Sequence, residues 1–289
     1  MITRLAGCSS EAVETVAGFV YKDNGFLAAE FPHCSSPSEV SAVLRAGAET
    51  WYVLISTRPV ALFKLDVFKS VANISKFCHN VDESIDATLT LLRDDIRKMK
   101  VIDLNATVWQ KYAETFAANG YENRGVLIRL SRTPIEVKMM PILPLTNPTK
   151  NELQILANLM YESYRKIEPE VTIESKEGIL RRIMLGPKGT YLSDASFASG
   201  APPNLVSACL VTLSSSTEAS VAELFTHPLY RARGLATTEI AAAMSKLIEH
   251  KIETMTALVQ EQNQVAKRLF SKIGFQEAGR LAEMTARIR

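Results

Sequence analysis

The sequence has 289 residues, of which 47% are hydrophobic and 22% are charged, and its formal net charge is +2. This length suits two domains of ordinary size, and the composition is typical of a globular protein with full hydrophobic cores. The small net charge argues against a general nucleic-acid-binding protein, which would need a concentrated basic surface.

The chain carries no sign of a membrane, a metal or a disulfide framework. No apolar run approaches the roughly 20 residues of a membrane span. The first seven residues lack the apolar core of a secretory signal, so we expect a cytoplasmic protein. The four cysteines are scattered without a CxxC pair, at Cys8, Cys34, Cys78 and Cys209. His–Cys neighbours at 33–34 and 78–79 cannot form a metal site by themselves, and we expect no metal.

Helical and strand patterns alternate along the first half of the chain. Apolar residues at helical spacing predict helices over 11–20, 38–48, 80–99 and 107–118. Runs rich in Val, Leu and Phe predict strands over 50–56, 60–68, 72–78 and 101–104, and residues 121–130 are predicted to form either a pair of strands or one long bent strand. Asn80 and Glu83 resemble a capping box at the start of the third helix.

The second half begins after a proline-rich connection. Four prolines between 131 and 151 forbid a long helix there, and 135–140 has the composition of a strand. Thr149 and Glu152 form a capping box for a helix that ends near Tyr164, and a second helix is predicted over 175–185. Strands are predicted over 190–198, 205–213, 221–225, 254–260, 275–280 and 281–286.

A short basic loop with one glycine follows the strand 221–225. It reads Thr226-His227-Pro228-Leu229-Tyr230-Arg231-Ala232-Arg233-Gly234-Leu235-Ala236, and a helical pattern follows it. The first amides of a helix have no partner inside the helix, and the helix dipole favours an anion there. Gly234 permits a positive φ or a close ligand, and Arg231 and Arg233 add charge that suits phosphate. The stretch is either an anion-binding loop or a plain strand–helix turn with solvated arginines.

A second stretch, 263–275, follows the strand 254–260. Asn263 is a favourable N-cap and Gly274 a favourable residue just past a helix end. The apolar residues between them share one helix face.

Together, in this order and separation, the two stretches resemble the GCN5-related N-acetyltransferase (GNAT) family. The acetyl-CoA loop of that family has the pattern Gln/Arg-x-x-Gly-x-Gly/Ala, matched by Arg231, Gly234 and Ala236. The next block of the family, Asn-x-x-Ala-x-x-Leu-Tyr-x-x-x-Gly-Phe, is matched by Asn263, Ala266, Leu269, Gly274 and Phe275. The resemblance implies an α/β (α+β) fold with a mixed, mostly antiparallel central sheet flanked by helices.

The first half of the chain follows the same order of elements as the second. Phe116, Gly120 and Tyr121 even echo Phe270, Gly274 and Phe275. We therefore predict two tandem GNAT-like domains, 1–132 and 133–289. The anion loop does not recur, because the corresponding residues 78–83 have no glycine and include two carboxylates, which would repel a pyrophosphate. We expect a degenerate first domain that does not bind CoA; the alternative is an unrelated α/β domain.

The resemblance also implies which residues bind acetyl-CoA, the co-substrate. The backbone amides of the loop would hold the pyrophosphate, which assigns binding to Arg231, Ala232, Arg233, Gly234, Leu235, Ala236 and Thr237. Phe225 and Thr226 would lie beside the pantetheine arm, and Asn263 would reach the cofactor from the next helix. Phe270 belongs to the same set, at a position where the family often has a tyrosine.

The family reaction is direct attack of an amine on the thioester, and general acid–base help typically contributes about 10²–10⁴-fold. A phenylalanine at 270 cannot donate a proton to the leaving thiolate, although water could do so. Glu223 is the first choice for the base because it lies on the strand that leads to the loop; otherwise it is a solvent-facing residue. His227 and Tyr230 are further candidates.

The sequence therefore predicts an acetyl-CoA-dependent N-acetyltransferase whose C-terminal domain is active. The alternative is a non-catalytic CoA-binding or interaction protein of the same fold, and a longer acyl group is a third reading. The expected partners are acetyl-CoA and an unidentified amine acceptor, without nucleic acid or membrane, in a monomer or homodimer.

Overall fold

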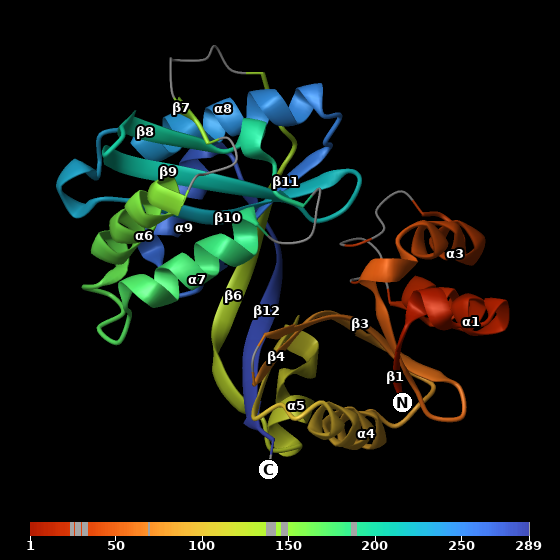
Figure 1. The fold of residues 1–289 in the computed structure, drawn as a ribbon. Helices are drawn as coiled ribbons and strands as arrows, with labels where there is room; N and C mark the ends of the chain where they lie inside the picture. The colour runs from red at the N-terminus through yellow and green to blue at the C-terminus, as the bar shows by residue number, and fades with distance from the viewer. Residues whose placement is uncertain are drawn as a thin grey trace. The chain divides into compact units, whose positions relative to one another are not determined.

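A computed structural model describes residues 1–23, 26, 30, 34–68, 70–136, 143–145, 150–185 and 190–288. Contacts between residues divide the chain into two compact units. Unit 1 comprises Met1–Ile128, Gln260–Gln262 and Ala278–Arg289. Unit 2 comprises Arg129–Val259 and Asn263–Glu277. The last strand of the chain therefore belongs with the first half of the sequence (Figure 1).

Unit 1 contains a mixed sheet with strand order β1-β2-β3-β4-β5-β12-β6. Its strands are β1 (Ile2–Arg4), β2 (Tyr52–Ile55), β3 (Pro59–Phe68), β4 (Val71–His79), β5 (Asp103–Trp109), β6 (Glu122–Arg132) and β12 (Gln276–Arg287). Its helices are α1 (Ser10–Lys22), α3 (Pro37–Ala46), α4 (Ile85–Lys98) and α5 (Ala113–Ala118). β4 and β5 are parallel, whereas β1–β2, β2–β3, β3–β4 and β5–β12 are antiparallel.

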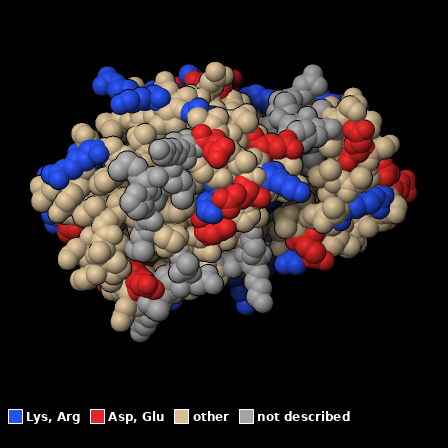
Figure 2. Space-filling view, turned by 90° about the horizontal axis from the view of Figure 1, so that it is seen from above, with Lys and Arg blue, Asp and Glu red and all other residues tan. Residues whose placement is uncertain are grey.

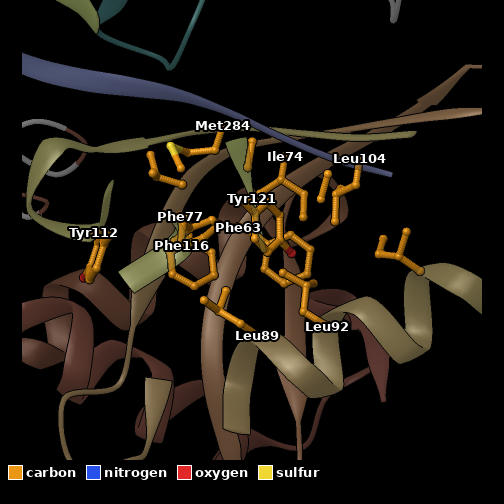
Figure 3. Packing of buried hydrophobic residues seen from close by; sticks show 14 of the residues in the cluster. Phe63, Ile74, Phe77, Leu89, Leu92, Leu104, Tyr112, Phe116, Tyr121 and Met284 are labelled. Carbon is orange, nitrogen blue, oxygen red and sulfur yellow. The ribbon is translucent and has the colours of Figure 1, made fainter. Parts of the chain in front are cut away.

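Alternation along the strands of unit 1 builds a core on each face of its sheet. Ala61 and Phe63 of β3 lie in a cluster with the apolar stripe of α4, whereas Leu62 between them packs with α1 and α3. Successive side chains of a strand point to opposite faces, so this strand is buried on both sides. Met284 of β12 lies in the same cluster as Phe116 (Figure 3), so the C-terminal strand completes the core of this unit.

Unit 2 repeats this plan around strands in the order β11-β10-β9-β8-β7. Its strands are β7 (Leu143–Pro144), β8 (Phe197–Ala201), β9 (Asn204–Leu213), β10 (Glu218–Thr226) and β11 (Thr254–Gln260). Its helices are α6 (Lys150–Tyr164), α7 (Ile173–Met184), α8 (Leu235–Glu249) and α9 (Gln264–Ile273). Ala208 and Leu210 of β9 pack with α6 and α7, while Ser207 on the other face bonds to α8.

The two units share a local structure that the sequence echo predicts. Phe116 and Tyr121 have ring centroids 4.9 Å apart, and so do Phe270 and Phe275. In each pair the second residue donates its backbone N–H to the carbonyl of the first, at 3.1 and 3.0 Å. The intervening glycines are both left-handed, with φ of 79° and 98°. The same helix end and the same turn into a strand therefore occur twice.

Among the described residues, each unit also holds a pair of parallel strands whose pairing ends after a short register. β4 pairs with β5 over Val71–Ile74, and β10 pairs with β11 over Glu218–Val221. All four strands continue for several residues beyond these registers. Diverging parallel strands leave room between their carboxyl ends, which is where open α/β sheets bind ligands.

The predicted fold class is confirmed, and most predicted elements lie within a few residues of their observed bounds. The helix predicted over 107–118 is wrong in its first part, because β5 continues to Trp109 and a 3₁₀ turn, Gln110–Tyr112, precedes α5. The helix α4 is capped by Ser84, which accepts from the Ala87 amide, and not by Asn80. The strand predicted over 190–198 begins only at Phe197.

Other predictions concern the end of the chain and the connection. The two strands predicted over 275–280 and 281–286 are one continuous strand, β12. The predicted strand 135–140 and the cap at Thr149 lie largely or wholly outside the described residues. The division into domains 1–132 and 133–289, the first degenerate and the second binding CoA, stays a prediction.

Basic and acidic side chains are interspersed on the face shown in Figure 2, in keeping with 33 basic and 31 acidic residues in the sequence. Within the described ranges, no helix has the length and apolar content needed to cross a membrane.

Candidate functional site

The loop between β10 and α8 is exposed and carries two left-handed residues. Ala232 has φ 62° and Gly234 has φ 83°, the conformation that the sequence position of the glycine predicts. Gly234 is the N-cap of α8, and as a glycine it has no side chain to cap the first amides of this helix. A Cβ added at Gly234 would meet no atom within 4 Å, so the space above the helix start is open. Exposed amides at a helix start favour an anion.

The two arginines of the loop brace it. Arg231 donates through Nη2 to the Ser163 carbonyl at 2.7 Å and through Nε to the Thr226 carbonyl at 3.3 Å. Arg233 donates to the Leu229 carbonyl at 3.1 Å, and its guanidinium lies 5.0 Å from the ring centroid of Tyr230. These contacts hold the loop in one conformation, and they place the two guanidinium charges within it.

His227 and Tyr230 have local structural contacts. Nδ1 of His227 accepts from the Leu229 amide at 3.3 Å, so the imidazole caps the short turn Pro228–Tyr230. The rings of His227 and Tyr230 meet edge to face at 5.7 Å. Tyr230 is 38% exposed. As catalytic candidates both stay predictions.

Glu223 lies on β10 beside an irregularity in the strand. The β10–β9 register shifts between Val221 and Glu223, which is a bulge at Ala222. Bulges often occur next to active sites, where they redirect a side chain. The Tyr164 hydroxyl donates to Oε2 of Glu223 at 3.2 Å. Burial raises the pKa of the Glu223 carboxyl to about 7, although the Tyr164 hydrogen bond and the Lys176 charge lower it. A carboxyl with this pKa changes protonation near neutral pH, as a general base should.

The remaining predicted cofactor residues lie around the loop and in α9. Thr226 ends β10, and its Oγ1 lies 2.8 Å from Oγ of Ser207. Phe225 is buried against α6, whereas Leu235, Ala236 and Thr237 form the first turn of α8 and are partly exposed. Asn263 caps α9 by accepting from the Ala266 amide at 3.0 Å.

Phe270 is a core residue. Its side chain is 3% exposed and packs edge to face on Phe275. The structure therefore brings Glu223, Thr226 and the loop to the carboxyl end of β10, and places the Phe270 ring in the interior of unit 2.

Sequence reasoning missed one buried carboxyl, Glu239, in the helix that follows the loop between β10 and α8. Glu239 of α8 is fully buried and accepts hydrogen bonds from Ser199 at 2.7 Å and Ser207 at 2.9 Å. Burial raises its pKa to about 7, against those hydrogen bonds. Ser207 also contacts Thr226, so a polar chain connects the interior to the end of β10. A glutamate next to Ile240, on the apolar face of a predicted helix, was the available signal.

The described residues hold no cluster of three or more His, Cys, Asp or Glu side chains suited to a metal ion. Cys78 and Cys209 are buried thiols, and burial raises the pKa of both.

Comparison with known proteins identifies the fold. Residues 201–285 match the family model for FR47-like proteins. No curated protein matches the sequence.

Solved structures are similar over all or most of the chain at low sequence identity. A GCN5-related N-acetyltransferase from Sphaerobacter thermophilus is 12% identical with a TM-score of 0.65, covering 100% of this chain and 96% of its own. A tandem GNAT protein from the clavulanic acid biosynthesis pathway is 16% identical with a TM-score of 0.64, covering 100% and 98%. A GCN5-related N-acetyltransferase from Kribbella flavida is 12% identical with a TM-score of 0.51, covering 78% and 86%. The resemblance predicted from the sequence is confirmed: the chain has the fold of tandem GNAT proteins, and its residues 201–285 match the GNAT-related FR47-like family.

Proposed function

We propose that unit 2 transfers an acetyl group from acetyl-CoA to an amine acceptor. One observation carries this proposal: the parallel strands β10 and β11 diverge after Val221 and Ala257, directly beside an exposed, glycine-capped helix start. The FR47-like match covers both strands and this loop.

The loop fits the phosphates of acetyl-CoA. The uncapped amides at the start of α8 supply hydrogen-bond donors, and Gly234 leaves space above them. Arg231 and Arg233 add positive charge within the same loop, which strengthens binding of a pyrophosphate. Residues Arg231 to Thr237 would hold this part of the molecule.

The diverging ends of β10 and β11 suit the pantetheine arm of acetyl-CoA. Leu258 of β11 lies beyond the paired register and is 48% exposed. Val265 in the first turn of α9 is 80% exposed. A partly apolar pantetheine arm that ran along the end of β10 past Thr226 would remove apolar surface of this kind from water.

Glu223 is the proposed proton acceptor. An amine is mostly protonated at neutral pH, and its nitrogen lone pair is free to attack only after a proton leaves. The Glu223 carboxylate takes that proton, and the nitrogen then bonds to the thioester carbonyl carbon. The carbon–sulfur bond breaks to release thiolate, and the nitrogen loses its second proton to water to give the neutral amide. Phe270 cannot protonate the thiolate, so we assign that proton to water.

In unit 1, the space between the diverging ends of β4 and β5 is bridged by hydrogen bonds, which supports a degenerate first half. Asp23, which follows α1, accepts from Lys111 at 2.6 Å and from the Tyr112 hydroxyl at 3.2 Å, just after β5. The same carboxylate lies 3.9 Å from the Cys78 thiol of β4, beyond the paired register. Asp23 therefore connects the two diverging strand ends in unit 1.

The test is calorimetric titration of acetyl-CoA and desulfo-CoA into the whole protein, followed by thiol release with a panel of primary amines. One site per chain together with amine-dependent thiol release is the expected result. Two sites would show that unit 1 also binds. No binding of either compound would overturn the proposal.

A second candidate is a CoA-binding protein without catalysis, which the buried Phe270 ring favours because it removes a proton donor. Stoichiometric binding without thiol release across the panel would select this candidate.

A further inference from the structure

Glu223 is surrounded by ionisable groups from two helices and the turn between them. Tyr164 at the end of α6 donates to it directly. Lys176 of α7 and Glu168 in the connecting turn act on it through their charges. The positive charge of Arg231, in the loop, acts in turn to lower the pKa of Tyr164. These are the ionisable groups that the described residues direct at this carboxyl.

Tyr164 fixes one oxygen of the carboxylate. Its hydroxyl is the donor to Oε2, which leaves Oε1 as the second acceptor of the group. Burial raises the pKa of the Tyr164 phenol far above its ordinary value, so the phenol keeps its proton throughout the working pH range. Tyr164 is therefore a permanent donor that orients Glu223, and it is too weak an acid to release a proton itself.

Lys176 is a buried cation with two contacts. Its side chain is 5% exposed, and Nζ forms an ion pair with Oε2 of Glu168 at 2.7 Å. The same Nζ lies 4.2 Å from the centroid of the Tyr164 ring. Burying a lysine is costly unless it is paired, and here the ion pair with Glu168 and the contact with the Tyr164 ring hold the ammonium beside the residue that binds Glu223.

We propose that Tyr164 and Lys176 are positioning residues for Glu223, an inference that rests on the proposed function. Tyr164 holds the carboxylate through Oε2. Lys176, whose Nζ lies 4.2 Å from the Tyr164 ring centroid, supplies positive charge that favours the ionised form of this carboxylate. Glu168 is the ion-pair partner of Lys176 and partly cancels its charge. Removing the Glu168 charge therefore increases the lowering of the Glu223 pKa by Lys176.

The signs of these effects give a sharp test. Lys176→Met removes a cation and Tyr164→Phe removes a hydrogen bond, and both had favoured the ionised form. Each substitution should raise the pKa of Glu223. Glu168→Gln removes an anion and should lower it. Glu168 is half-exposed, so this variant is expected to fold even where a change at buried Lys176 does not.

The experiment uses the full chain with ¹³C-labelled glutamate carboxyls, titrated by NMR, with Glu223→Gln to assign the resonance. Lys176→Met and Tyr164→Phe should raise the Glu223 midpoint by about half a pH unit or more, and Glu168→Gln should lower it. Lys272→Met is the control, because it makes the same chemical change at an exposed residue of α9. An unchanged midpoint in Lys176→Met and Glu168→Gln, or shifts of both in the same direction, would overturn the inference.

A second readout separates this inference from the proposed function. With the amine that releases most thiol, the acidic limb of the kcat/KM profile should move with the NMR midpoint. Shifted midpoints without any thiol release would leave the positioning intact and remove the acetyltransferase. Thiol release with a fixed acidic limb in all three variants would remove the positioning role and keep the acetyltransferase.

Discussion

Gly279 of β12 lies directly against the indole ring of Trp109 in β5. A Cβ built on Gly279 would come within 2.5 Å of Cζ3 of that ring, and the glycine has φ 154°. The adjacent pair Leu281 and Trp109 begins the antiparallel register between the two strands. The glycine therefore allows the last strand of the chain to close over the ring.

Gly279→Ala should destabilise unit 1 by about 1–3 kcal/mol, because a rigid ring has to move for the new methyl group. Both tryptophans of the chain, Trp51 and Trp109, lie in unit 1. Urea unfolding followed by tryptophan fluorescence therefore reports on this unit.

Gly18→Ala is the matched control. Gly18 lies within α1, and an added Cβ would meet no atom within 4 Å. This change should leave unit 1 unchanged or more stable by up to about 1 kcal/mol. Equal stability of Gly279→Ala and the wild type would show that the strand contact is not tight.

The sequence predicts these strands but not their partners. Alternating residues in 275–286 indicate a strand, yet the pairing of β12 with β5 depends on contacts across more than half the chain. The extension of β5 to Trp109 was missed because Thr107 to Ala118 also has helical spacing. Local pattern finds an element; packing sets its ends and its neighbours.

The candidate site shows the same division. The loop and Glu223 could be found from the sequence because the motif fixes their place along the chain. Tyr164 reads as one more residue on the apolar face of α6, and only the fold brings its hydroxyl to Glu223. Glu239 could be noticed as a charged residue on the apolar face of a predicted helix. Its serine partners lie on two strands, β8 and β9, which the sequence does not connect with this helix.

Gly234→Asp should weaken acetyl-CoA binding by a factor of about ten or more, measured by calorimetry. The new carboxylate would stand among the loop amides and repel phosphate, and the left-handed φ of 83° adds strain of about 1 kcal/mol. Gly234→Asn is the matched control, since asparagine tolerates this conformation and carries no charge. Equal losses in both variants would argue against an anion at this loop.

Glu239→Gln should change how stability depends on pH. The folded-state pKa of Glu239 is about 7 against an ordinary 4.5, so the folded state binds more protons between these values. The free energy of unfolding of the wild type therefore falls as pH rises through this interval. Relative to the wild type, Glu239→Gln should gain roughly 2 kcal/mol between pH 5.5 and 8.5, because about 1.5 pH units of the interval lie above pH 5.5.

Urea unfolding at both pH values, followed by circular dichroism, measures this difference. Glu170→Gln is a suitable control, because it makes the same chemical change at an exposed residue of unit 2. Parallel pH profiles for Glu239→Gln and the wild type would mean that Glu239 is ionised in the folded protein across the whole range.

Glu223→Gln should lower kcat/KM for amine acetylation by about 10²–10⁴-fold near pH 8, the contribution expected of a general base. Glutamine keeps an oxygen that can accept the Tyr164 hydrogen bond, so the side chain is expected to stay in place. Binding of acetyl-CoA, measured by calorimetry, should be unchanged because Glu223 lies on the strand before the loop.

The difference between variant and wild type should depend on pH. The wild type loses its proton acceptor as pH falls through the Glu223 pKa of about 7, whereas glutamine does not titrate. The two rates should therefore converge by about tenfold for each pH unit below 7. A rate ratio that stays constant from pH 6 to pH 8 would show that Glu223 does not accept the proton, and would return His227 and Tyr230 to consideration.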